Sequence, residues 1–229
     1  MRQFFQSSLG KKYVMAVSGF LLFGFVIVHM VGNLQIFLGP KPLNRYAHFL
    51  QSTPELLWPA RIGLLTLVGL HIWSAVRLSA ENKAARPLAY AGNPAPVAAS
   101  YASRTMLMSG VIVAAFILYH LLHFTVQTPS VNLTGHDFKT LLDSQTNHRD
   151  VFRMMVIGYS NAWVSGFYVL AMALLCLHLS HGVSAMFQSV GLRNERSEKW
   201  IDRAARAAAA IIFIGNSSIP IAVLLGYGR

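Results

Sequence analysis

The chain has 229 residues, of which 54% are hydrophobic and 12% are charged. A soluble domain carries about twice that share of charged residues, so the composition excludes an ordinary soluble enzyme domain. The formal net charge is +11, but the basic residues border apolar runs and form no separate domain. We therefore expect a membrane protein whose charge sets its orientation, with no nucleic-acid partner.

Five runs with few or no charges predict an all-α membrane protein, with residues 1–229 in a single membrane domain. A helix needs about 20 apolar residues to cross the hydrocarbon core, and it satisfies its own backbone hydrogen bonds there. The expected spans cover about 13–38, 56–78, 104–127, 156–188 and 204–227. The first is too long for a signal peptide, and no cleavage site of small residues follows it.

The basic residues predict the orientation of these helices. Twelve of the 19 lysine and arginine residues lie on the side of the N-terminus and of the loops 77–104 and 193–206, and seven lie on the other side. Loops rich in lysine and arginine stay in the cytoplasm. We therefore expect a multi-pass protein of the inner (cytoplasmic) membrane, with its N-terminus in the cytoplasm and its C-terminus outside.

Signals between the spans are of the ordinary kind. Thr53, Pro54 and Glu55 are typical of a helix start, and residues 86–100 predict a cytoplasmic loop rich in Pro and Gly. Some local structure is expected in the long outer loop 127–153. The single cysteine excludes a disulfide framework, and the sequence contains no C-x-x-C-H, dinucleotide-binding or phosphate-loop motif.

One histidine in each of the first four spans carries the functional argument; they are His29, His71, His120 and His178. Spans one and three run outward, so the first and third histidines lie in the outer half of the membrane. Spans two and four run inward, so the other two lie in the inner half. A lone intramembrane histidine usually bonds a neighbouring helix. Two pairs at depths about ten residues, or ~15 Å, apart instead predict two bis-histidine haem sites in a four-helix core, with the fifth helix beside it.

Small residues support this interpretation. The pattern S-G-x9-H occurs in 18–29 and again in 109–120. Gly19 and Gly110 each fall ~15 Å inward of the histidine on their own helix, at the level of the inner pair, where a missing side chain leaves room for a macrocycle. Gly63 and Gly166 fall near the outer pair. Close helix packing also favours glycine, but the matched pattern on four helices favours haem.

Metal transport and proton pumping are the rival functions for these histidines. Both usually need carboxylates or a polar path through the bundle, and none of the five predicted spans contains Asp or Glu. Haem needs only axial ligands from the protein, because the porphyrin supplies the other four. Each ligand also has a neighbour one turn away that could replace it, His123 for His120 and His181 for His178. The S-G-x9-H repeat favours His120.

Nearly the whole chain resembles one family. The segments VIVHMVGN, LNRYAHFLQSTPELLW, GLHIW, LYHLLH and LHLSHG are similar to the single-subunit, five-helix dihaem cytochrome b anchor of succinate:quinone and fumarate:quinone oxidoreductases. The spacings from His29 to His48 and from His48 to His71 resemble those of the Gram-positive succinate dehydrogenase subunits. The family's H-x-x-x-G motif matches His178 and Gly182. The long loop 127–153 departs from the family pattern.

The resemblance implies an electron-transfer function. His71 and His178 would hold a proximal haem b, and His29 and His120 a distal haem b. A flavoprotein subunit and an iron–sulfur subunit would dock on the cytoplasmic face, and this chain would pass electrons to a quinone, menaquinone by the resemblance. It would be the quinone-reactive subunit of the enzyme complex of the respiratory chain and tricarboxylic acid cycle, without a dicarboxylate site of its own.

Quinone reduction needs hydrogen-bond donors and protons near the outer haem. Four polar residues of the outer side are candidates for that site: Asn44, His48, Glu55 and Arg61. An interfacial polar loop is an equally good interpretation of His48. Two other functions stay open, a dihaem cytochrome b of another respiratory enzyme such as a hydrogenase or formate dehydrogenase, and a membrane scaffold without haem.

Overall fold

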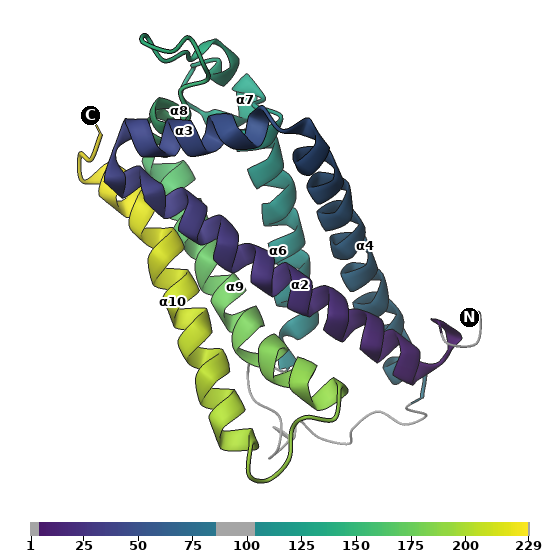
Figure 1. Ribbon diagram of the computed structural model, residues 1–229. Helices are drawn as coiled ribbons and strands as arrows, with labels where there is room; N and C mark the ends of the chain where they lie inside the picture. Colours follow the sequence, from purple (N-terminus) through teal and green to yellow (C-terminus); the bar gives the residue numbers. More distant parts are fainter. Residues whose placement is uncertain (1–4, 86–103, 229) are drawn as a thin grey trace.

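The computed structural model describes residues 5–85 and 104–228 as a bundle of long helices (Figure 1). In chain order the elements are α2 (Ser8–Leu34), the 3₁₀ turn η1 (Gln35–Leu38), α3 (Pro40–Gln51), α4 (Pro54–Ala84), α6 (Met106–His120), the π-helical turn η2 (Leu121–Thr125), α7 (Pro129–Asn132), the 3₁₀ turn η3 (Phe138–Thr140), α8 (Val151–Tyr159), α9 (Ala162–Ser189) and α10 (Glu198–Leu224). Within the described residues, the only extended pairing is an isolated bridge between Leu142 and Arg149. The predicted loop 86–100 lies outside these residues.

Five of these segments are long and apolar enough to cross a membrane, as the sequence predicts. They are Ser8–Leu38, Pro54–Ala84, Met106–Thr125, Ala162–Ser189 and Glu198–Leu224. Large apolar side chains such as Val17, Leu65 and Ile214 are exposed on their surface, whereas Ser74 and Ser165 are completely buried. Apolar side chains outside and small polar ones between helices are typical of a bundle in lipid. The chain is a multi-pass membrane protein.

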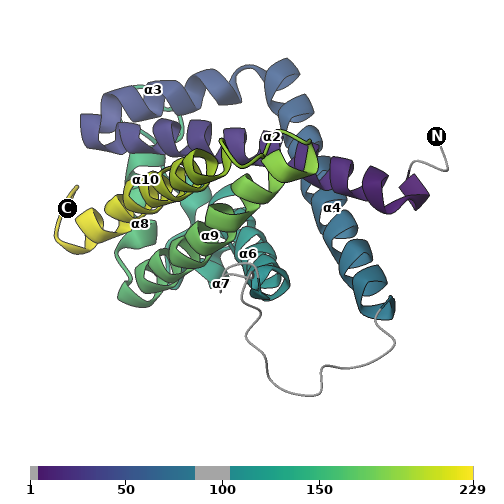
Figure 2. The same ribbon diagram turned by 90° about the horizontal axis from the view of Figure 1, so that it is seen from below.

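The spans place the termini at opposite ends of the bundle. In Figure 1, α2 starts at the N-terminal end and crosses the bundle obliquely, and α3 lies across its far end. Helix α10 packs on α9 and α2, and it lies on the side of the bundle away from α4 (Figures 1 and 2). Four helices therefore remain around the histidines, with α10 beside them.

Several helix boundaries differ from the predicted ones. Helix α2 begins at Ser8 rather than near residue 13, α4 ends at Ala84 rather than near 78, and α10 begins at Glu198 rather than near 204. The fourth span begins at Ala162 rather than near residue 156, because the side chain of Asn161 caps α9 by accepting the N–H groups of Trp163 and Val164. The residues before it form the separate helix α8. Residues 40–51, expected as part of an outer loop, form helix α3 after Gly39, whose φ of 95° suits glycine. Thr53 and Pro54 do open α4.

The outer loop 127–153 has local structure of the kind expected from its length, and it is tied to the bundle. Asn44 of α3 donates to the Asp150 carboxylate and accepts the N–H of Phe152, at 3.0 and 2.9 Å. Phe138 is buried and packs against the rings of His123 and Phe124. The loop therefore closes the outer end of the helices that carry the outer histidines.

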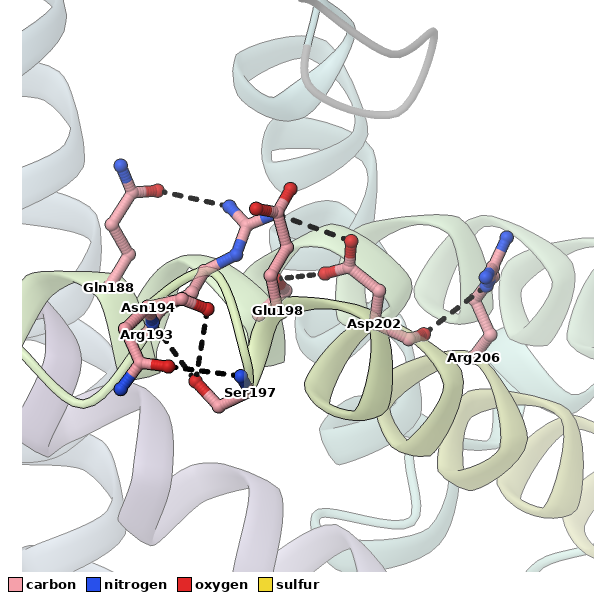
Figure 3. A network of polar contacts seen from close by, with 8 residues as sticks. Gln188, Arg193, Asn194, Ser197, Glu198, Asp202 and Arg206 are labelled. Atoms are coloured by element: carbon pink, nitrogen blue, oxygen red, sulfur yellow. Dashed lines mark hydrogen bonds and ion pairs between the residues drawn. The ribbon is translucent and has the colours of Figure 1, made fainter.

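At the inner end, three ion pairs among the described residues hold the ends of the helices. Lys11 is buried and forms an ion pair of 2.8 Å with Glu81, which joins α2 to α4. In the turn between α9 and α10, Arg193 bonds both Glu198 and Asp202, at 3.0 and 3.2 Å (Figure 3). Not every basic residue on this side is therefore free to bind a partner.

Candidate functional site

The inner histidine pair joins α4 to α9. The rings of His71 and His178 have centroids 6.3 Å apart and planes at 69°. Both side chains are half-buried. They come from non-consecutive helices that run in the same direction, which is why similar positions along the two spans place them at the same depth.

A serine on each of the two other core helices bonds an inner histidine. The hydroxyl oxygen of Ser18 lies 3.2 Å from Nδ1 of His71, and that of Ser109 lies 3.2 Å from Nδ1 of His178. Each hydroxyl also lies within hydrogen-bond distance of a backbone carbonyl of its own helix. Ser18 is 2.7 Å from the carbonyl oxygen of Val14 and 3.2 Å from that of Met15, and Ser109 is 3.1 Å from that of Met106.

These contacts favour one tautomer of both inner histidines. A serine hydroxyl has one hydrogen, and where a backbone carbonyl accepts it, the imidazole donates from Nδ1 to the hydroxyl oxygen. In the neutral ring, Nε2 is then left with a free lone pair. That is the form in which an imidazole binds a metal, with its other N–H held by an acceptor.

The two glycines of the S-G-x9-H repeat contact these same rings. A Cβ added at Gly19 would lie 3.2 Å from Cε1 of His71, and one at Gly110 would lie 3.4 Å from Cε1 of His178. The glycines therefore make room for the imidazoles themselves, whereas the sequence suggested room for a macrocycle. Because Gly19 is ten residues from His29, the inner and outer pairs are separated by ~15 Å along α2.

The outer pair joins α2 to α6. The ring centroids of His29 and His120 are 5.6 Å apart with planes at 87°. Aromatic rings lie against both of them, Phe25 against His29 at 5.2 Å and Phe116 against His120 at 5.9 Å. The hydroxyl of Tyr168 lies 3.3 Å from Nδ1 of His120.

The alternative histidines have different surroundings. His123 is completely buried and its Nδ1 lies 2.9 Å from the Tyr168 hydroxyl. Its ring packs on Phe124, with centroids 4.0 Å apart. His181 is half-buried at the inner end of α9. The ring that faces His29 is that of His120, and the ring that faces His71 is that of His178.

The separation within each pair suits one metal with two axial imidazoles. A nitrogen bound to a first-row metal lies about 2 Å from it and about 1.1 Å from its own ring centroid, so two opposed axial rings have centroids about 6 Å apart. The observed values are 5.6 and 6.3 Å. No group of three or more His, Cys, Asp or Glu side chains suited to a metal ion occurs among the described residues. Each pair thus offers two ligands, which fits a metal whose equatorial ligands come from a macrocycle.

The glycines predicted near the outer pair are exposed. Apart from its chain neighbours and the nearby backbone of its own helix, nothing lies within 4 Å of a Cβ added at Gly63 or at Gly166. Gly166 lines a shallow apolar groove together with Trp163 and Phe167. The ring of Phe167 packs on Phe116, so this groove is two rings away from His120.

The four residues predicted to bind quinone do not share contact partners in the structure. Asn44 is buried, and its amide is engaged with α8. The ring of His48 stacks on that of His148, with centroids 3.7 Å apart, and Arg61 lies over the ring of Trp58 at 5.3 Å. Glu55 is exposed in the first turn of α4.

Comparison with protein-family models, with curated proteins and with solved structures gives no match. The two histidine pairs, and the side chains that hold them, therefore carry the functional conclusion. Sequence reasoning missed Ser18, Ser109 and Tyr168 as partners of the histidines. The serines did have a signal, because each stands next to a glycine of the repeat.

Proposed function

We propose that this chain is the dihaem cytochrome b anchor of a succinate:quinone oxidoreductase. The observation that carries the dihaem assignment is the pair of neighbouring histidines at each of two depths in a membrane bundle, and the succinate:quinone assignment rests on the resemblance of the sequence to that family. His71 and His178 would hold one haem b through Nε2, and His29 and His120 the other. A bound haem supplies an iron that takes up and releases one electron.

The residues around the pairs have distinct tasks in this proposal. Ser18 and Ser109 keep the proton of each inner imidazole on Nδ1, so that Nε2 can coordinate. Gly19 and Gly110 leave space for those rings. The lipid-facing apolar surface holds both pairs inside the bilayer, away from water. Because the pairs lie ~15 Å apart along one helix, they provide two stations for electrons along the membrane normal.

Partners and location follow from the same proposal. A flavoprotein and an iron–sulfur subunit dock on the end that holds the N-terminus, which the excess of basic residues places in the cytoplasm. The membrane is the inner (cytoplasmic) one. Electrons leave at the outer end to a quinone, for which menaquinone is the candidate. Glu55, His48 and Arg61 remain candidates for that site, whereas the amide of Asn44 is already occupied in holding α8.

Purification of the chain from its native membranes in mild detergent tests the proposal. We expect two non-covalent b haems per chain, both low-spin in reduced-minus-oxidised spectra, together with a flavin-containing and an iron–sulfur subunit. Succinate should reduce the haems. A chain without haem would refute the dihaem assignment. If the chain contained two haems but co-purified with a hydrogenase or formate dehydrogenase, the dihaem cytochrome assignment would stand and the succinate assignment would be refuted.

Replacing the inner serines provides a second test. Ser18→Ala or Ser109→Ala removes an acceptor from Nδ1–H, which makes the ligand less basic and stabilises ferric iron less. We expect the midpoint potential of the inner haem alone to rise, and its retention to weaken by about 10- to 100-fold at most. Redox titration and haem extraction measure both effects.

Ser74→Ala is the matched control. Ser74 is completely buried on the same helix as His71, and it donates to the backbone carbonyl of His71. The midpoint potentials of the inner and the outer haem should both stay unchanged in this variant. A shift of the outer potential in the Ser18 or Ser109 variants would contradict the assignment.

A further inference from the structure

A buried tyrosine and histidine stand behind His120. Tyr168 is only 4% exposed and His123 is completely buried. The tyrosine hydroxyl lies 3.3 Å from Nδ1 of His120 and 2.9 Å from Nδ1 of His123. His123 lies in the π-helical turn Leu121–Thr125. Segments of π-helix are rare in proteins and often occur at functional sites. One hydroxyl thus serves two imidazole nitrogens.

Two directions of this chain of contacts use the hydrogen of the tyrosine hydroxyl. The hydroxyl donates that hydrogen to one imidazole, and the other imidazole donates to the hydroxyl oxygen. If Tyr168 donated to His120, the neutral His120 ring would carry its hydrogen on Nε2. That nitrogen would then have no lone pair for a metal. In the opposite direction, His120 donates to Tyr168 and Tyr168 donates to His123, and Nε2 of His120 is free.

We propose that Tyr168 and His123 are positioning residues for the outer haem, which fix the tautomer of His120. This inference rests on the proposed function. His120 donates from Nδ1 to the Tyr168 hydroxyl, and Nδ1 of His123 accepts the hydrogen of that hydroxyl. They do at the outer pair what Ser18 and Ser109 do at the inner pair. His123 is thus a support of its neighbour and not a substitute ligand.

The burial of His123 agrees with a supporting role. In the proposed direction Nε2 of His123 carries the hydrogen of the neutral ring. It has no hydrogen-bond partner among the described residues and would lie 3.3 Å from a Cβ added at Gly158. The rings of Phe124, Phe138 and Tyr168 surround it. The ring is therefore enclosed by the α8 helix and aromatic side chains, while Nδ1 points to Tyr168.

Tyr168→Phe in the full chain is the decisive variant. It keeps the ring in the aromatic cluster and removes the hydroxyl. We expect the midpoint potential of the outer haem to rise, and its retention to fall by about 10- to 100-fold, with the inner haem unchanged. The inner haem also reports that the variant has folded.

Tyr119→Phe is the matched control. Tyr119 is adjacent to His120 in sequence, and its hydroxyl donates to the carbonyl of Val131 in the outer loop. The Tyr119→Phe variant also loses a phenolic oxygen, at the position next to His120 in sequence. The midpoint potential of the outer haem should therefore stay at the wild-type value.

His123→Phe separates a support from a ligand. The variant should retain both haems, with a smaller rise of the outer potential than in Tyr168→Phe, because the tyrosine oxygen can still accept from His120. Loss of the outer haem in His123→Phe, with an unchanged potential in Tyr168→Phe, would overturn the inference. A wild-type chain without haem would instead overturn the proposed function.

Discussion

Alanine at any one of the four paired histidines should remove or destabilise one of the two proposed haems and leave the other. His71→Ala and His178→Ala should affect the same inner haem, and His29→Ala and His120→Ala the same outer one. The reason is that each pair stands within 6.3 Å, centroid to centroid, and an iron that loses one axial ligand keeps a single protein bond.

Haem count and spin state of the purified variants measure this effect. We expect the count to fall from two to one per chain, or one of two haems to become high-spin. His181→Ala is the control, since His181 lies one turn from His178 and should leave both haems in place. If His71→Ala and His29→Ala disturbed the same haem, the pairing would be wrong.

Leucine at Gly19 or Gly110 should disrupt the inner haem, although each glycine shares a helix with an outer histidine. A Cβ alone would already lie 3.2 or 3.4 Å from an inner imidazole, so a leucine must displace that ring. Overpacking destabilises a folded protein by about 1–3 kcal/mol. The displaced imidazole would also no longer be oriented to coordinate the iron.

Spectra that resolve the two haems measure the result, with Gly24→Leu as the control. Gly24 lies on the same helix as Gly19 and is exposed, and a Cβ added there would meet nothing within 4 Å beyond its chain neighbours and the nearby backbone of α2. The Gly24→Leu variant should retain both haems. Selective loss of the outer haem in the Gly19 or Gly110 variants would refute the proposed role of these glycines.

Hydropathy and length determined the membrane topology by themselves. A segment that crosses lipid must be apolar and helical over about 20 residues, and this local requirement does not depend on neighbouring helices. The direction of each span then fixed the depth of its histidine. That is why the sequence could match His71 with His178 and His29 with His120, whose rings the structure brings together in edge-on pairs.

Only the tertiary structure decided which side chains support those histidines. A helix in lipid is apolar on all its faces, so the sequence does not reveal its rotation about its own axis. The contact of Ser18 with His71, and of Tyr168 with His120, depends on that rotation. The break between α8 and α9 and the π-helical turn at Leu121–Thr125 depend on caps and packing from distant segments. The sequence therefore determined the helices and the depth of their histidines, and the packing of the helices determined which atoms meet.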